Sequence, residues 1–238
     1  MTPKKKVVLL IVEGFNDQTA LAVSLEELLT DENVKFEITN GDITADYIGK
    51  NIAAKIGDCV NSHCKIYGFE KSDILEVVLL VDMDGAYISP ESIIHHCDHD
   101  TPYYNSDKIL HSKSEELKKT HDRKMLNLNR LITLPNVSRT IPFSIYFFSC
   151  NLDHVICGNA NLTKREKSKA ANSFQRQFHS DINGFLKFFH GTNIAVGNTY
   201  EESWNYIKQD TNSLKRCSNL HIFLSAEAIR IPRDFTEV

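Results

Sequence analysis

The sequence predicts an α/β fold with a mainly parallel sheet flanked by helices. Two short apolar runs, residues Val7–Val12 and 77–81, consist of valine, leucine and isoleucine without polar alternation. Such runs are typical of central strands that are buried on both faces. Segments with helical spacing separate the predicted strands, and this strand–helix alternation favours right-handed crossovers and parallel pairing.

The first half of the chain has clear element boundaries. After the first strand, Asn16 or Asp17 can cap a helix that carries leucines at helical spacing. Residues 35–39 alternate around two apolar side chains and predict a second strand, which stops at the turn Asn40-Gly41-Asp42. A second helix is expected over residues 45–63, before the strand at 77–81.

The second half is predicted to be mainly helical. Residues 90–104 are expected to be irregular, followed by a helix over 112–131 and a buried strand over 143–148. Helices are then expected over Leu152–Cys157, 164–178, 182–189 and 201–208, and a last strand over 221–224. We therefore expect a core of residues 1–150 and a helical extension of residues 151–238 that packs on the same domain.

Composition predicts a globular protein of the cytoplasm. The 238 residues are 42% hydrophobic, which is enough for a substantial core. No apolar stretch approaches the roughly 18 residues that a membrane span needs, and the first six residues carry no cleavable signal pattern. The six cysteines are scattered along the chain, which favours reduced thiols.

The charge distribution is uneven although the net charge is only -4. Residues 113–139 carry seven Lys or Arg against three Asp or Glu, and residues 164–176 carry five against one. Either segment is equally well explained as a solvated helix face. Together with acids elsewhere, however, they are the pattern expected of an acidic crevice flanked by phosphate-binding surfaces.

Three acids follow the two buried strands directly. Glu13-Gly14 comes after the first strand, and Asp82-Met83-Asp84-Gly85 comes after the strand at 77–81. In parallel sheets the ligand crevice lies beyond the carboxyl ends of the strands. Side chains two residues apart on a strand share a face, so Asp82 and Asp84 are expected to reach the same ion. Clustered carboxylates favour Mg²⁺ or Mn²⁺.

These motifs resemble the TOPRIM domain of topoisomerases, bacterial primases and several nucleases. The resemblance covers residues 7–149: Glu-Gly follows the first strand, and Asp-x-Asp follows the third about 70 residues later. The chain also looks like the compact TOPRIM proteins of bacterial anti-phage defence, of the OLD, RloB-like and PARIS-effector types. Their polar helix start after the next strand would correspond here to residues 149–154.

The resemblance implies a metal-dependent nuclease with a TOPRIM (Rossmann-like) sheet. Asp82 and Asp84 would coordinate the metal, and Glu13 would complete its shell or act as general base. Asp17 and Asp153 would be ligands of a second metal, although both also fit helix N-terminal positions.

Lys164 or Arg165 would contact the scissile phosphate, unless both simply lie on the surface. The substrate would be DNA or RNA. An ABC-type ATPase partner would be a separate chain, because no Walker A loop is present. Homo-oligomerisation stays open.

Three other interpretations remain open. Val-Asp-Met-Asp-Gly also resembles the first motif of haloacid-dehalogenase phosphatases, which would make Asp82 a nucleophile, and Asp-x-Asp holds Mn²⁺ in some glycosyltransferases. A non-catalytic TOPRIM scaffold that docks to an ATPase is the third.

The polar cluster at residues 95–100, with three histidines and one cysteine, suggests zinc, but its spacing matches no recognised ligand set, which favours a polar surface loop.

Overall fold

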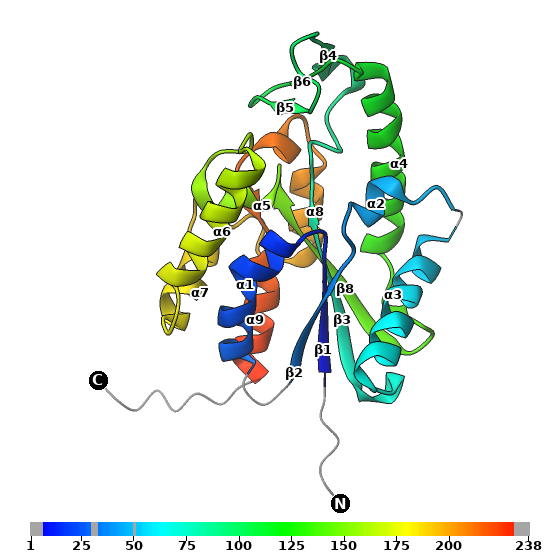
Figure 1. Cartoon of the computed structure of the whole chain (residues 1–238), viewed down its shortest axis with the longest axis vertical. Helices are drawn as coiled ribbons and strands as arrows, with labels where there is room; N and C mark the ends of the chain where they lie inside the picture. Colours follow the sequence, from blue (N-terminus) through cyan, green and yellow to red (C-terminus); the bar gives the residue numbers. More distant parts are fainter. Residues whose placement is uncertain (1–6, 30–32, 50, 231–238) are drawn as a thin grey trace, which may run out of the picture.

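A mostly parallel sheet forms the centre of the protein (Figure 1). The computed structural model describes residues 7–29, 33–49 and 51–230. The strand order is β2-β1-β3-β8, all parallel, and two short antiparallel strands, β7 and β9, pair with β8. The strands are β1 (Val7–Val12), β2 (Asn33–Ile38), β3 (Ile74–Asp82), β7 (Asn136–Val137), β8 (Ile141–Ser149) and β9 (Cys217–Ser218). The predicted α/β class with a mainly parallel sheet is confirmed.

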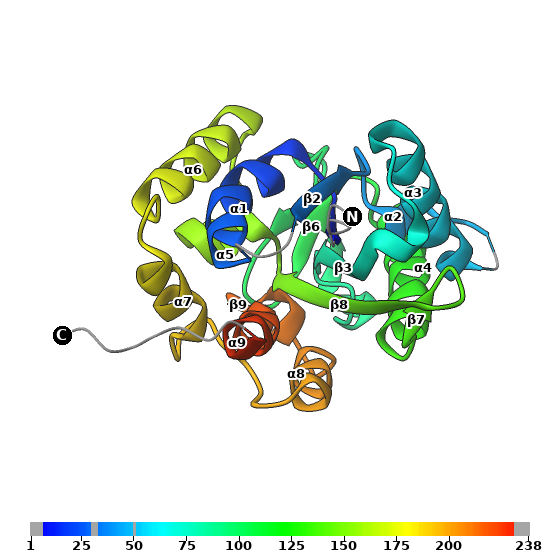
Figure 2. The same ribbon diagram turned by 90° about the horizontal axis from the view of Figure 1, so that it is seen from below.

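Helices cover both faces of this sheet (Figure 2). One face packs against α1 (Phe15–Leu28), α5 (Leu152–Cys157), α6 (Lys164–Gln177), α7 (Ile182–His190) and α9 (Leu220–Arg230). The other face packs against α2 (Ile43–Asp46), α3 (Ile52–Tyr67), α4 (Ser114–Ile132) and α8 (Tyr200–Ile207). Three short 3-10 turns lie at Lys71–Asp73, Pro90–Ser92 and Asn212–Leu214.

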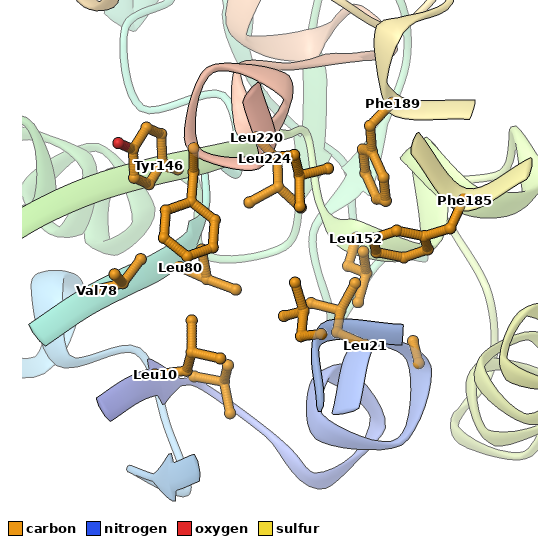
Figure 3. Close-up of a cluster of buried hydrophobic side chains, with 14 of the residues drawn as sticks. Leu10, Leu21, Val78, Leu80, Tyr146, Leu152, Phe185, Phe189, Leu220 and Leu224 are labelled. Atoms are coloured by element: carbon orange, nitrogen blue, oxygen red, sulfur yellow. The ribbon is translucent and has the colours of Figure 1, made fainter. Parts of the chain in front are cut away.

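Strand alternation divides the apolar side chains between these two layers. In β1, Val8 and Leu10 belong to the cluster on the α1 face, whereas Leu9 and Ile11 belong to the cluster on the α4 face. β3 and β8 divide in the same way, because successive side chains of a strand point to opposite faces. Figure 3 shows the α1-face cluster, where Leu10 and Leu80 of the sheet meet residues of α1, α5, α7 and α9.

The segment between β3 and α4 contains a small second sheet, where we expected irregular structure. It consists of β4 (Ile93–His95), β5 (Tyr103–Tyr104) and β6 (Ile109–His111), with β6 in the middle. Strands of two or three residues are too short to leave a periodic signal in the sequence. This sheet lies beyond the carboxyl ends of β1 and β3, at the top of Figure 1.

Two predicted elements are wrong. The single helix over 45–63 is two helices, α2 and α3, because the chain leaves the helical conformation at Tyr47 and Asn51 caps α3 by accepting a hydrogen bond from the Ala54 amide at 3.1 Å. The predicted strand at 221–224 lies inside α9. Leu220, Phe223 and Leu224 are buried at the i, i+3, i+4 spacing of a helix, which a short apolar run does not distinguish from a strand.

All six cysteines are free. Within the described ranges, no helix is both long and apolar enough to cross a bilayer. The first six residues, where we found no signal pattern, lie outside those ranges.

Candidate metal centre at the carboxyl ends of the strands

The acids that follow β1 and β3 lie together. β1 and β3 pair in parallel, so their carboxyl ends reach the same edge of the sheet. An oxygen of the Glu13 carboxylate accepts a hydrogen bond from the backbone amide of Asp82 at 3.2 Å. The structure therefore brings Glu13 next to the Asp-x-Asp motif, 69 residues away in the chain.

Three carboxylates form the tightest acidic group, which we call the carboxylate triad: Glu13, Asp42 and Asp84. One oxygen of each lies within 4.8 Å of the others, and all three residues are half-buried. Asp42 was not among the predicted site residues. It follows β2 in the turn Asn40-Gly41-Asp42, and β2 pairs in parallel with β1, so the same argument about strand ends could have identified it.

A buried lysine from α4 is paired with this triad. The Lys124 Nζ lies 2.6 Å from an oxygen of Asp42 and 2.6 Å from an oxygen of Asp84, and Lys124 is only 1% exposed. Burial disfavours the ammonium form, but attraction to Asp42, Asp84 and Glu13 outweighs it and raises the pKa of Lys124 well above its usual value. Lys124 therefore carries a fixed positive charge inside the acidic group.

Two carboxylates of the triad, Glu13 and Asp42, have pKa values shifted in opposite directions. Burial, followed by repulsion from Asp42, raises the pKa of Glu13 well above its usual value. Partial burial acts on Asp42 in the same direction, but the Lys124 charge and hydrogen bonds from Lys124, Thr44 and the Ala45 amide outweigh it and lower the pKa of Asp42. Asp42 is therefore the ionised carboxylate of this pair. Glu13 holds its proton more tightly, and a further positive charge nearby would favour its ionisation.

Asp84 reaches the triad through a turn. β3 ends at Asp82, Asp84 adopts a left-handed conformation with φ of 49°, and Gly85 follows with φ of 73°. The Asp84 amide donates to the carbonyl of Cys150 at 2.6 Å, which fixes the turn against the end of β8. The second carboxylate oxygen of Asp84 accepts a hydrogen bond from the Tyr104 hydroxyl at 2.9 Å. Tyr104 belongs to β5, so the small sheet contributes to the site.

Asp82 lies on the α1 face of the main sheet, whereas Lys124, the partner of Asp84, belongs to α4 on the opposite face. Val78 and Leu80 face α1, and strand alternation places Asp82 on that side as well. Its carboxylate accepts a hydrogen bond from the Leu152 amide, at the start of α5, at 2.8 Å. Burial, then repulsion from Asp17 and Asp84, raises the pKa of Asp82 well above its usual value. The expectation that Asp82 and Asp84 share a face is wrong, because the strand ends between them.

Asp17 links Asp82 to Asp153 in a second acidic group, because Asp17 repels Asp82 and Asp153 repels Asp17. Asp17 occupies the third position of α1 and accepts a hydrogen bond from the Gly14 amide at 2.8 Å, so Gly14 and not Asn16 or Asp17 is the cap residue. Burial raises the pKa of Asp17 to about 6, with a further contribution from Asp153. Asp153 is itself paired with Lys167 of α6 at 3.0 Å.

A cavity of about 320 Å³ touches each acidic group at one residue. Asp82 and Asp84 both line it, together with Tyr104, Asn151 and Lys167. Each group therefore has a lysine of its own, Lys124 for the triad and Lys167 for the group around Asp82. The cavity opens between them and is large enough for a phosphate group with bound water.

The remaining predicted site residues lie elsewhere. Lys164 and Arg165 are exposed and line a groove on the outer surface of α6, and it is Lys167 that reaches the acids. In the segment 95–100, the His96 and His99 rings pack against each other with centroids 4.8 Å apart. Among the described residues, this segment provides no group of three convergent metal ligands.

Lys124, Lys167 and Tyr104 could not be identified from the sequence. Each lies 20 or more residues after Asp84 in the chain, and none belongs to a recognised motif. Helical periodicity favours neither Lys124 nor Lys167 over the other lysines of α4 and α6. Only the packing of these elements around the strand ends selects them.

The chemistry of the donor set suits a metal ion. Three carboxylate oxygens within 4.8 Å of one another can hold a single cation, and carboxylate oxygens are typical ligands of hard divalent ions. The pairing of Lys124 with Asp42 and Asp84 means that the structure already places one positive charge there. Comparisons with protein-family models, curated proteins and solved structures gave no match, so the function has to be argued from this site.

Proposed function

We propose that this protein is a Mg²⁺- or Mn²⁺-dependent phosphodiesterase that cleaves DNA or RNA. The observation that carries the proposal is the carboxylate triad of Glu13, Asp42 and Asp84, held at the carboxyl ends of three adjacent parallel strands. Its position is where ligand crevices form in sheets of this kind. The charge of Lys124 offsets the repulsion between the carboxylates of the triad.

The roles of the residues follow from their contacts. Glu13, Asp42 and Asp84 would hold the metal, which when bound supplies an acidified water and charge neutralisation for a phosphate. Lys124 and the Tyr104 hydroxyl orient the two oxygens of Asp84. Lys167, at the wall of the cavity, can pair with a phosphate oxygen in place of Asp153.

The proposal includes the TOPRIM family and a role in anti-phage defence with a separate ATPase partner. Support for the family comes from the placement of Glu13 and the Asp-x-Asp motif at adjacent parallel strand ends. The defence role and the ATPase rest on the sequence resemblance alone.

A phosphatase that uses Asp82 as nucleophile has less support. One carboxylate oxygen of Asp82 accepts a hydrogen bond from the Leu152 amide. Burial, together with two neighbouring acids, raises the pKa of Asp82, which favours the protonated form, and this form is a weak nucleophile. A scaffold without catalytic activity is an outcome that the experiment below distinguishes.

The test is incubation of the purified protein with supercoiled plasmid, single-stranded DNA and tRNA, each with Mg²⁺, Mn²⁺ or EDTA. We expect cleavage with metal and none with EDTA. Asp84→Asn should lose at least a hundredfold in rate, because it removes a metal ligand charge. A chain that binds Mn²⁺ but cleaves none of these substrates would be a scaffold, and the proposal would be wrong.

The matched control is Glu27→Gln beside Glu13→Gln. Both substitutions remove one carboxylate, but Glu27 lies on the exposed surface of α1. Circular dichroism spectra and melting curves of both variants would show whether a loss of cleavage is caused by a loss of fold. We expect cleavage to disappear in Glu13→Gln and to stay at the wild-type rate in Glu27→Gln.

A further inference from the structure

The exposed surface of α6 carries four cations in one groove. The groove is shallow and open to solvent, because all its lining residues belong to one face of α6. Lys164, Arg165, Lys169 and Arg176 line it, and its other residues are serines and an asparagine. Serine and asparagine side chains add hydrogen-bond donors without negative charge, so the groove as a whole suits an anion.

The cations of this groove have one acidic neighbour among the described residues, Glu166, which attracts Lys169. Within the described ranges, none of the four lies within 4.0 Å of a carboxylate oxygen. The acid of the helix, Glu166, is engaged in the cap with Thr163. The basic segment of α4 differs, because Lys118 is paired with Glu115 and Lys124 with the triad. The two segments look alike in sequence, but α6 retains more of its charge for a ligand.

The groove starts beside the acidic site, because Asn161 and Leu162 line the cavity and α6 begins two residues later at Lys164. Lys167 of the same helix reaches Asp153, and the Ser168 hydroxyl donates to the Asn16 side chain of α1 at 3.1 Å. α6 therefore begins at the cavity and leads away from it along α1 (Figure 1). At 1.5 Å per residue, the twelve steps from Lys164 to Arg176 span about 18 Å. That length accommodates several consecutive phosphates of a nucleic-acid strand.

We infer that this α6 groove binds the phosphate backbone of a nucleic acid and directs the strand to the cavity between Asp82 and Asp84. The inference rests on the proposed function and adds the substrate-binding surface to it. Contacts from Lys and Arg to phosphates carry no base information, so binding is independent of sequence. It also depends on salt, because each neutralised phosphate releases counterions.

The test measures binding without cleavage. Fluorescence anisotropy with labelled 30-nucleotide single-stranded DNA, duplex DNA and single-stranded RNA is recorded in EDTA over a range of salt concentrations. We expect Arg165→Gln/Lys169→Gln to weaken binding at least tenfold for the preferred substrate. The slope of log affinity against log salt should fall by about 2, one unit for each phosphate contact removed.

The matched control is Lys65→Gln/Lys119→Gln, which removes two exposed charges from α3 and α4 on the opposite face of the sheet. It should bind within twofold of the wild type. Equal losses in both double variants would mean that only the overall charge matters, and the inference would be wrong. Binding to anionic phospholipid vesicles but to none of the nucleic acids would also contradict it.

The same variants separate this inference from the proposed function. If Asp84→Asn binds nucleic acid like the wild type but does not cleave it, both hold. If the wild type binds through α6 and no chain cleaves, the groove is a binding surface and the proposed hydrolysis fails. If Arg165→Gln/Lys169→Gln binds and cleaves like the wild type, the proposed hydrolysis stands and the inference fails.

Discussion

At the scale of single residues, Lys124 decides how the acidic site holds together. Three half-buried carboxylates repel one another, and the ammonium of Lys124, 2.6 Å from two of them, offsets that repulsion. Removing one partner of a buried ion pair leaves the other uncompensated, which costs far more than the pair itself contributes. The stability of the site therefore depends on this one side chain.

We predict that Lys124→Met lowers the free energy of unfolding by about 3–5 kcal/mol, as measured by urea denaturation in EDTA. Excess Mn²⁺ should restore part of this loss, because the metal replaces the missing positive charge between Asp42 and Asp84. The control is Lys118→Met on the same helix, whose partner Glu115 also lies 2.6 Å away but in solvent. It should cost much less, and similar losses in both variants would contradict this account of Lys124.

His121, one turn before Lys124 on α4, gives a pH dependence. It is 6% exposed, and burial lowers its pKa to about 4. The unfolded chain binds a proton to this histidine near pH 6.5 whereas the folded chain does not, so stability falls as the pH drops from 6.5 towards 4. Between pH 7 and pH 5 this effect reaches about 2 kcal/mol.

We therefore expect His121→Gln to lose less stability than the wild type between pH 7 and pH 5. Denaturation at both pH values measures this difference. His179→Gln, which changes an exposed histidine, should keep the wild-type pH dependence. If His121→Gln also keeps it, His121 is not buried as a neutral side chain.

At the scale of elements, the turn after β3 positions the site. Gly85 has a positive φ of 73°, and a Cβ atom there would lie 2.7 Å from Leu214 and 2.9 Å from Ile109. The turn thus needs glycine for its backbone conformation and also for space.

The sequence predicts that acids follow β1 and β3, because apolar runs and glycines mark strand ends. It does not predict where β3 ends within the Asp-x-Asp motif, so the face of Asp84 could not be derived.

We predict that Gly85→Ala lowers the free energy of unfolding by about 2–4 kcal/mol, from left-handed strain and overpacking together. Gly68 at the end of α3 provides the control, because its φ is also positive at 70° but no atom lies within 4 Å of an added Cβ. Gly68→Ala should cost only about 1 kcal/mol. Equal effects in denaturation experiments would mean that the contacts with Leu214 and Ile109 do not constrain the turn.

At the scale of the whole molecule, the helices after β8 complete the core instead of forming a separate one. Phe185 and Phe189 of α7 and Leu220 of α9 belong to the same buried cluster as Leu10 of β1 (Figure 3). The two-faced sheet and its parallel order could be predicted, because the apolar runs at 7–12 and 77–81 are rich in β-branched residues and are each followed by an acid and a glycine. The small sheet at 93–111 and the helix at 221–224 could not, because short apolar segments fit either structure.

We predict that Phe185→Ala, which empties a fully buried position, lowers the free energy of unfolding by about 3–5 kcal/mol. Because this cluster joins residues 1–150 to the later helices, a single transition should be observed by both circular dichroism and tryptophan fluorescence. Phe15→Ala is the control, since Phe15 is 71% exposed. A separate early transition that affects only the Phe185→Ala variant would indicate two independent domains.

The central claim is that Glu13, Asp42 and Asp84 together bind a divalent cation. Anomalous diffraction from crystals of the wild-type protein soaked in Mn²⁺ tests it most directly. The account predicts an anomalous peak within coordination distance of oxygens from all three carboxylates. A saturating soak that places Mn²⁺ only elsewhere, with Lys124 still between Asp42 and Asp84, would contradict it.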